Sequence, residues 1–401
     1  MRGLCAQTFL KNIIPRQQHL IAVRKSVPVC RRPARGNLKA ASSPAVASPD
    51  AEPPRNSKST ESDQHEVPEG IAEPMSEEVV VTEQQRRRKL WFAAIKPPMY
   101  TVSIVPVLVS AAAAYAATGV LSISKCLQLN LASILIILWL NLSNDAFDAD
   151  MNTDGNKPES VVNLTGNRNG VLATAFACFA VGIAWLWSLV TGPAVQGDPR
   201  IAIMLGIAIV MGYVYQGPPF RWSYKGLGEP LCFVAFGPLA TCAFYLAQVS
   251  RPIGSMPTAA VAVPDVSAAV VACSVVVGIT TSLILFCSHF HQIPDDIAAN
   301  KISPLVRLGT ANGVKVLQLA LAAVYGLVAL STAVGWLPPG CFGALCLAAP
   351  VVKDFLVFAE TNHTAPPVIR FLKLHCIKVH SAVGLALIVG LCLPQLCAIY
   401  L

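Results

Sequence analysis

Residues 131–159 read LASILIILWLNLSNDAFDADMNTDGNKPE, an apolar run that passes directly into a dense set of aspartates and asparagines. The apolar part has the character of a membrane-spanning helix, which needs about 20 mostly apolar residues. The polar part holds four aspartates, and like charges held this close repel one another unless a cation lies between them. The stretch therefore predicts a membrane helix that ends in a negatively charged site.

The composition of the whole chain agrees with a membrane protein. Of its 401 residues 54% are hydrophobic and 13% are charged, whereas about 25% of the residues of a soluble domain are charged. Apolar blocks with few charges are typical of membrane helices. Nine can be drawn, at roughly 101–118, 127–143, 171–191, 201–216, 230–248, 267–288, 316–337, 339–352 and 379–400, of which the eighth is short. We predict an all-α, polytopic membrane protein with about nine transmembrane helices.

The start of the chain differs from the rest. Residues 1–49 hold nine Lys or Arg and no acid, and Ser, Ala and Pro become frequent toward their end. This is typical of a plastid or mitochondrial transit peptide, and a basic tail with no targeting role is the alternative. The next residues are polar and acidic, as in disordered linkers. We predict a transit peptide over 1–60, a linker over 61–85 and a membrane domain over 86–401.

The charged residues give the membrane domain an orientation. If the nine blocks alternate and residues 86–89 mark the inner side, the inner segments hold sixteen Lys or Arg, and the opposite loops hold only Lys125, Arg200 and Arg251. This is the positive-inside pattern, so the net charge of +8 needs no nucleic-acid partner. Seven of the twelve acids after residue 85 follow the second and sixth blocks, both on the inner side. The two acidic segments are therefore expected to share one ligand.

The spacing of the first acidic segment favours a metal site. Asn144, Asp145 and Asp148 are spaced so that they can face one another on adjacent turns of a helix end, with Asn141 one turn earlier. Mg²⁺ takes oxygen ligands and is often shared between one or two carboxylates and a substrate phosphate. Two such clusters can clamp a diphosphate, with basic residues neutralising its remaining charge. The candidate basic residues are Lys157, Arg168, Lys301 and Arg307.

Two alternatives stay open for these acids. They can be solvated residues that cap helices. In the second segment, HFHQIPDDIAANK, His289 and His291 also allow a transition-metal site with imidazole ligands. A diphosphate held at the end of apolar helices nevertheless fits an allylic isoprenoid diphosphate, whose lipid tail would lie among the helices and whose departing diphosphate Mg²⁺ would stabilise.

Four stretches resemble the UbiA-type membrane prenyltransferases, and within them the 1,4-dihydroxy-2-naphthoate prenyltransferases of quinone synthesis. The pattern NxxNDxxDxxxxxD, from Asn141 to Asp154, is similar to the first aspartate motif of that family. The others are WFAAIKPPMYTVSIVPVLVSAA (91–112), YVYQGPPFRWSYKGLGEPLCFVAFGPL (213–239) and HFHQIPDDIAANKISPLVRLGT (289–310). Together they follow the family's order over about residues 90–400.

The resemblance implies a fold, a cofactor and roles for particular residues. It implies a helical bundle around a central cavity, Mg²⁺ dependence, and attachment of a prenyl chain to an aromatic ring that loses its carboxylate. The metal-ligand candidates are Asn144, Asp145, Asp148, Asp154 and Asp296, which the resemblance implies, and Asp295, which the acidic cluster adds; Asp145, Asp148 and Asp154 are the catalytic candidates. The substrate-binding candidates are Asn141, Asn144 and Gln292, which stand at positions of the family's motifs, and Lys157, Arg168, Tyr215, Lys301 and Arg307, which their residue types and positions suggest. Gln292 stands where many relatives have Asp, so a second metal ion is an open question.

With a plastid transit peptide, the resemblance implies a chloroplast membrane enzyme that joins phytyl diphosphate to 1,4-dihydroxy-2-naphthoate for phylloquinone synthesis. Tyr213, Tyr215 and Tyr224 are expected either to contact the substrates or to anchor the membrane interface, as Tyr commonly does. No residue is nominated as a base. The alternatives are a homogentisate prenyltransferase of tocopherol or plastoquinone synthesis and, in another class, an ion-coupled transporter. Uniformly apolar spans do not separate a phytyl tail from longer polyprenyl tails.

Overall fold

The computed structural model describes residues 83–150, 160–192, 198–250 and 265–400. Every regular element in these residues is helical. In chain order they are α2 (Glu83–Ile95), η1 (Pro97–Tyr100), α3 (Thr101–Thr118), α4 (Ile123–Asp150), α5 (Val161–Thr165), α6 (Arg168–Thr191), α7 (Pro199–Gln216), η2 (Trp222–Lys225), α8 (Gly228–Val234), η3 (Ala235–Thr241), α9 (Cys242–Val249), α10 (Ala268–Ser288), η4 (His289–His291), α11 (Ile293–Ala298), α12 (Pro304–Ala333), α13 (Pro339–Leu347), α14 (Ala349–Asn362), α15 (Pro366–Ile369) and α16 (Leu372–Tyr400). The predicted transit peptide, most of the predicted linker, and the candidates Asp154 and Lys157 lie outside the described residues.

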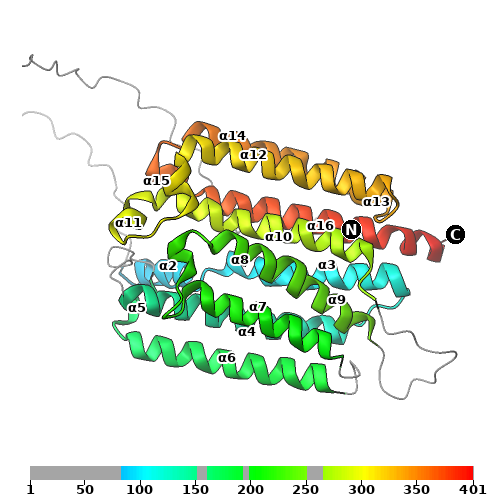
Figure 1. Ribbon diagram of the computed structural model, residues 1–401, viewed down its shortest axis with the longest axis horizontal. Helices are drawn as coiled ribbons and strands as arrows, with labels where there is room; N and C mark the ends of the chain where they lie inside the picture. Colours follow the sequence, from blue (N-terminus) through cyan, green and yellow to red (C-terminus); the bar gives the residue numbers. More distant parts are fainter. Residues whose placement is uncertain (1–82, 151–159, 193–197, 251–264, 401) are drawn as a thin grey trace, which may run out of the picture. The chain divides into compact units, whose positions relative to one another are not determined.

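The helices form a bundle of membrane-spanning length. Among the described residues, eight helical runs are long and apolar enough to cross a membrane, and α13 with α14, bent by 47°, makes a ninth if counted as one span. The predicted all-α, polytopic architecture with about nine transmembrane helices is confirmed. The long helices run alongside one another, and the short helices α5, α11 and α15 gather with α2 at one end, on the left of Figure 1.

Two helices extend beyond the apolar blocks that predict them. Helix α4 continues past 143 to Asp150, and α12 begins at Pro304 rather than near 316. The blocks mark only apolar residues, whereas a helix can continue beyond the apolar layer because its backbone hydrogen bonds are made within the helix. The first acidic segment therefore lies on the last turns of α4, which fixes the spacing of its side chains.

The fifth span is a continuous helix that widens in its middle. It consists of α8, the π-helical segment η3 and α9, and Pro238 lies inside η3. Proline has no N–H to donate and its ring crowds the preceding turn, which accounts for the wider helix here. A Cβ on Gly237 would lie 2.6 Å from the Ser274 carbonyl oxygen and 2.8 Å from Gly278 Cα, so this close crossing of η3 and α10 requires glycine. The crossing brings the start of α8 near the end of α10.

Small side chains of α3 lie in the core of the bundle. Ala111, Ala112, Ala113 and Ala114 of this helix are all buried, and such small side chains allow helices to approach closely in a membrane. Helix α3 packs against α16, α9 and α4. By contrast, α6 and α7 are the least buried of the candidate spans. Their exposed apolar side chains suit contact with lipid.

Candidate functional site

The first acidic motif is organised around Asp148 near the end of α4. Asn144 Nδ2 donates a hydrogen bond to Asp148 Oδ2 at 2.8 Å, and the Tyr224 hydroxyl donates to Asp148 Oδ1 at 2.9 Å. The amide comes from the preceding turn of α4, as the sequence spacing predicts, but the hydroxyl comes from η2. Asp148 is thus a partly buried carboxylate that two neutral donors hold in place.

Tyr224 connects the first acidic motif to the second. Its carbonyl oxygen accepts a hydrogen bond from Ile302 N at 2.8 Å, and the Lys301 ammonium lies 6.0 Å from the centre of its ring. Lys301 Nζ in turn lies 3.0 Å from Asp296 Oδ1. One polar network therefore runs from Asp148 through Tyr224 and Lys301 to Asp296. We call these four residues the bridging network.

Asp145 has different partners from its neighbour in the motif. Lys96 Nζ lies 3.1 Å from Asp145 Oδ1, and Val161 N donates to Asp145 Oδ2 at 3.2 Å. The Asp145 side chain retains only 4% of its exposure. Asp145 therefore ties the end of α4 both to the segment that precedes α3 and to the start of α5.

The donor set of the bridging network fits a hard cation such as Mg²⁺. Asp296 is buried, and its Oδ2 accepts no hydrogen bond from the described residues. Within those residues no three His, Cys, Asp or Glu side chains converge on one point. Mg²⁺ at phosphate sites needs only one or two protein carboxylates, because waters and phosphate oxygens complete its coordination. The open oxygen of Asp296 meets that requirement.

The other predicted site residues lie around this network with partners of their own. Arg168 forms a two-point contact with Asp150, at 3.0 and 2.6 Å, at the start of α6. Arg307 Nη2 donates to the Lys225 carbonyl oxygen at 3.2 Å. Gln292 precedes α11, and its carbonyl oxygen accepts from Asp296 N at 2.7 Å. Asp295 is exposed, and Asn141 is partly buried on α4.

Gln216 fixes α7 against α4 beside the motif. Its Nε2 donates to Ser143 Oγ at 2.6 Å and to the Leu140 carbonyl oxygen at 3.0 Å. Both acceptors are on α4, within a turn of Asn144. This contact helps to set the position of Tyr215, the predicted substrate-binding residue next to Gln216 in α7.

Three features of the site are not evident from the sequence. In the sequence Lys96 contributes only to the membrane orientation, Tyr224 is a contact or an anchor with no identified partner, and Glu229 has no predicted role. Glu229 Oε1 lies 3.0 Å from Nδ1 of His289. The available signal was a single Glu at the edge of an apolar block, which does not by itself name a partner.

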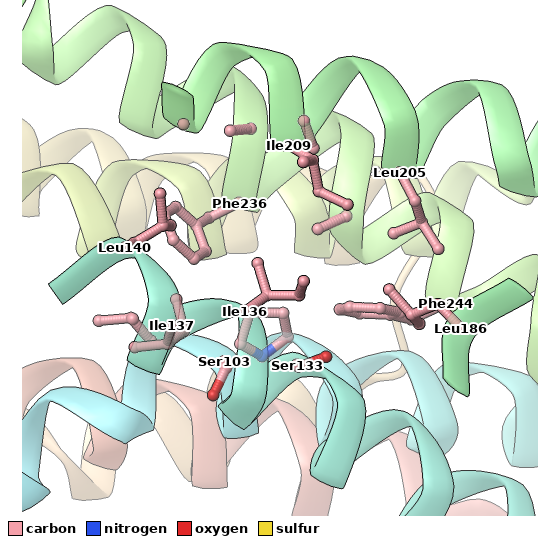
Figure 2. A pocket seen from close by; sticks show the side chains of 16 residues that line it. Ser103, Ser133, Ile136, Ile137, Leu140, Leu186, Leu205, Ile209, Phe236 and Phe244 are labelled. Atoms are coloured by element: carbon pink, nitrogen blue, oxygen red, sulfur yellow. The ribbon is translucent and has the colours of Figure 1, made fainter. Parts of the chain in front are cut away.

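An apolar cavity of about 80 Å³ lies in the bundle beside α4. Figure 2 shows Ile136, Ile137 and Leu140 of α4 facing Phe236 and Phe244 of the fifth span across it. Leu140 precedes the first acidic motif directly, so α4 contributes to both the cavity and the polar network. The fold thus defines a membrane protein with a polar cluster next to an apolar cavity.

Comparison with known proteins identifies the family. A profile of the UbiA prenyltransferase family matches residues 103–377. The chain is 45% identical over 309 residues, 77% of this chain and 78% of the relative, to 2-carboxy-1,4-naphthoquinone phytyltransferase, chloroplastic, of Arabidopsis thaliana. It is 40% identical over 305 residues, 75% and 92% of the two chains, to 2-carboxy-1,4-naphthoquinone phytyltransferase of Synechocystis sp.. It is 29% identical over 270 residues, 65% and 85%, to 1,4-dihydroxy-2-naphthoate octaprenyltransferase of Mycobacterium tuberculosis.

This chain belongs to the UbiA prenyltransferase family. The family expected from the four sequence stretches is confirmed, and so is the resemblance to naphthoate prenyltransferases. The chain is therefore a multi-pass membrane enzyme of the prenyltransferase type.

Proposed function

We propose that this enzyme transfers a phytyl group from its diphosphate to 1,4-dihydroxy-2-naphthoate, with loss of the ring carboxylate, in phylloquinone synthesis. The names of the relatives from Arabidopsis and Synechocystis support the naphthoate acceptor and the phytyl donor. The homogentisate and transporter alternatives have no such support. The observation that carries the proposal most directly is the joining of both acidic motifs through Tyr224, next to an apolar cavity.

The bridging network is proposed to hold the diphosphate. Asp148 and Asp296, with Asn144 and the predicted ligand Asp154, would hold Mg²⁺, which when bound neutralises charge on the departing diphosphate and so eases cleavage of the carbon–oxygen bond. The Lys301 ammonium and the Tyr224 hydroxyl are donors that can turn toward diphosphate oxygens. The diphosphate leaves with the bonding electrons, and the allylic cation that remains is captured by the ring carbon that bears the carboxylate.

The apolar cavity is proposed to hold part of the prenyl chain near this network. Its lining contains Ser103 and Ser133 as the only polar side chains among the described residues that border it. Ser103 Oγ donates to the Tyr100 carbonyl oxygen at 2.9 Å, so it does not present a free hydroxyl donor. Excluding water from this region protects an allylic cation from capture by water instead of by the ring.

Filling the cavity is expected to change the preferred donor. In Ala208→Phe, a phenyl ring would enter the cavity from α7. Turnover of phytyl diphosphate relative to geranyl diphosphate should fall by about tenfold, because overpacking excludes the longer chain. Ile207→Phe is the matched control, since Ile207 is the preceding residue and is 47% exposed. An unchanged donor ratio in folded Ala208→Phe would show that the chain lies elsewhere.

We also propose that the enzyme resides in a chloroplast membrane. The acid-free basic start of the chain supports an organellar address, and the Arabidopsis relative is described as chloroplastic. The location of the full chain fused to a fluorescent protein in leaf cells would test this proposal, and a mitochondrial signal would contradict it.

The acceptor is tested by competition in membranes that contain the full chain. Phytyl diphosphate and Mg²⁺ are supplied with equal concentrations of 1,4-dihydroxy-2-naphthoate and homogentisate, and the lipid products are separated by mass. The expected product is a prenylated naphthoquinol without the carboxylate. A prenylated homogentisate product would instead support tocopherol or plastoquinone synthesis. No product from folded protein with either acceptor would overturn the proposed activity.

A further inference from the structure

Glu229 and His289 form a partly buried pair that belongs to neither acidic motif. Glu229 lies in the first turn of α8, and His289 begins η4, directly after α10. His289 Nδ1 donates to Glu229 Oε1 at 3.0 Å, and the His289 and Glu229 side chains retain 4% and 14% of their exposure. Ser282 Oγ also donates to the Glu229 carbonyl oxygen at 3.1 Å. The pair is therefore fixed between α8 and α10.

The second carboxylate oxygen of Glu229 has no such partner. Glu229 Oε2 is buried and accepts no hydrogen bond from the described residues. Leaving a buried carboxylate oxygen without a donor is unfavourable, and proteins do so rarely. A purely structural link between α8 and η4 needs only Oε1. An oxygen without a hydrogen-bond partner, such as Oε2, is what a binding site needs for a ligand that donates a hydroxyl hydrogen bond.

Glu229 also borders the region of the acidic motifs. A Cβ on Gly228 would lie 2.9 Å from Tyr215 Cε2, so the Tyr215 ring packs against the start of α8. Gln216, the next residue of α7, is hydrogen-bonded to Ser143 of α4 beside the first acidic motif. The start of α8 therefore packs against the end of α7 that lies next to this motif.

We propose that Glu229 Oε2 binds the hydroxyl of the aromatic acceptor that neighbours the attacked ring carbon, and holds its proton during transfer. This inference rests on the proposed function. In the free acceptor that hydroxyl can donate to the ring carboxylate beside it. Donation to Glu229 would turn the hydroxyl away and leave the carboxylate free to depart as carbon dioxide. His289 holds Oε1 and thereby aims Oε2.

The step balances without another reagent. The ring carbon bearing the carboxylate bonds to the allylic carbon, and the neighbouring hydroxyl becomes a ketone as its proton moves to Glu229 Oε2. The carbon–carboxylate bond of this β-keto acid then breaks, and its electrons pass to the ketone oxygen. That oxygen takes the proton back from Glu229. The products are the prenylated naphthoquinol, carbon dioxide and diphosphate, and Glu229 is again a carboxylate.

The test has two parts, and both use the full chain in membranes. First, 1-hydroxy-2-naphthoate and 2-naphthoate are compared as competitive inhibitors, since they differ only in the hydroxyl that Glu229 would accept. The unaltered enzyme should bind the hydroxylated compound about 10- to 100-fold more tightly. Second, Glu229→Gln keeps the shape and an acceptor for His289 but cannot take a proton. It should lower kcat about 100-fold, leave KM for phytyl diphosphate within about threefold, and reduce the inhibitor discrimination at least about fivefold.

Each outcome separates this inference from the proposed function. Glu360→Gln is the control, because Glu360 is exposed on α14 and contacts Gln318; it should behave as the unaltered enzyme. If the unaltered enzyme is active with the naphthoate but binds both inhibitors equally, the inference is wrong and the function stands, whether or not Glu229→Gln folds. Unchanged kcat in Glu229→Gln would have the same meaning. No turnover of the naphthoate by the unaltered enzyme would remove the proposed function itself.

Discussion

Replacing Asp148 with alanine is expected to lower kcat for prenyl transfer by about 10³-fold or more, without unfolding the protein. Asp148 is the point where Asn144 and Tyr224 meet, at 2.8 and 2.9 Å. Removing its carboxylate takes away a proposed Mg²⁺ ligand and also the acceptor that holds the Tyr224 hydroxyl. The side chain is only partly buried, so water can replace it as a partner for both donors. The measurement is product formation with the protein's folded state checked by its unfolding midpoint.

Two further variants show whether the charge or the position matters. Asp148→Asn retains a side chain that can accept from Tyr224 but lacks the charge, so a loss close to that of the alanine variant would indicate that the charge is essential. Asp354→Asn makes the same change at an exposed acid on α14 and should retain activity within about threefold. Near-normal turnover in folded Asp148→Ala would remove Asp148 from the site.

The fold could be predicted because its signals are local in sequence. The apolar residues of a membrane helix indicate where it lies, so the nine blocks appear in the right order. Helix spacing likewise predicts the contact between Asn144 and Asp148. The helix ends and the π-helical segment η3 could not be placed in the same way. They depend on backbone hydrogen bonds and on packing against α10. The hydrophobicity of a segment indicates neither of these.

The site was predictable only where its residues share one helix. The partners of the acids come from far along the chain: Lys96 is 49 residues from Asp145, Tyr224 is 76 residues from Asp148, and His289 is 60 residues from Glu229. Charge counts can place such residues on one side of a membrane. Only the packing of the helices decides which cation or hydroxyl meets which carboxylate.

Replacing Lys96 with methionine is expected to be the most damaging change for stability near the site. The Asp145 side chain is 4% exposed, and Lys96 supplies the one cation within salt-bridge distance of it among the described residues. Methionine has a similar length and cannot neutralise the carboxylate. Removing one partner of a buried pair costs about 3–5 kcal/mol, and the partial exposure of Lys96 favours the lower end. The free energy of unfolding in detergent, measured with a denaturant series, would detect this loss.

The double variant Lys96→Met with Asp145→Asn separates two roles of Asp145. The asparagine is neutral and its carbonyl oxygen can still accept from Val161 N, so most of the stability should return relative to Lys96→Met alone. Activity should stay low if Asp145 also contributes to the metal site, as the sequence predicts. If the double variant regains activity together with stability, Asp145 only holds α4 to its neighbours. The catalytic carboxylates would then be only those of Asp148, Asp296 and Asp154. A Lys96→Met protein as stable as the unaltered one would show that water or another cation already screens Asp145.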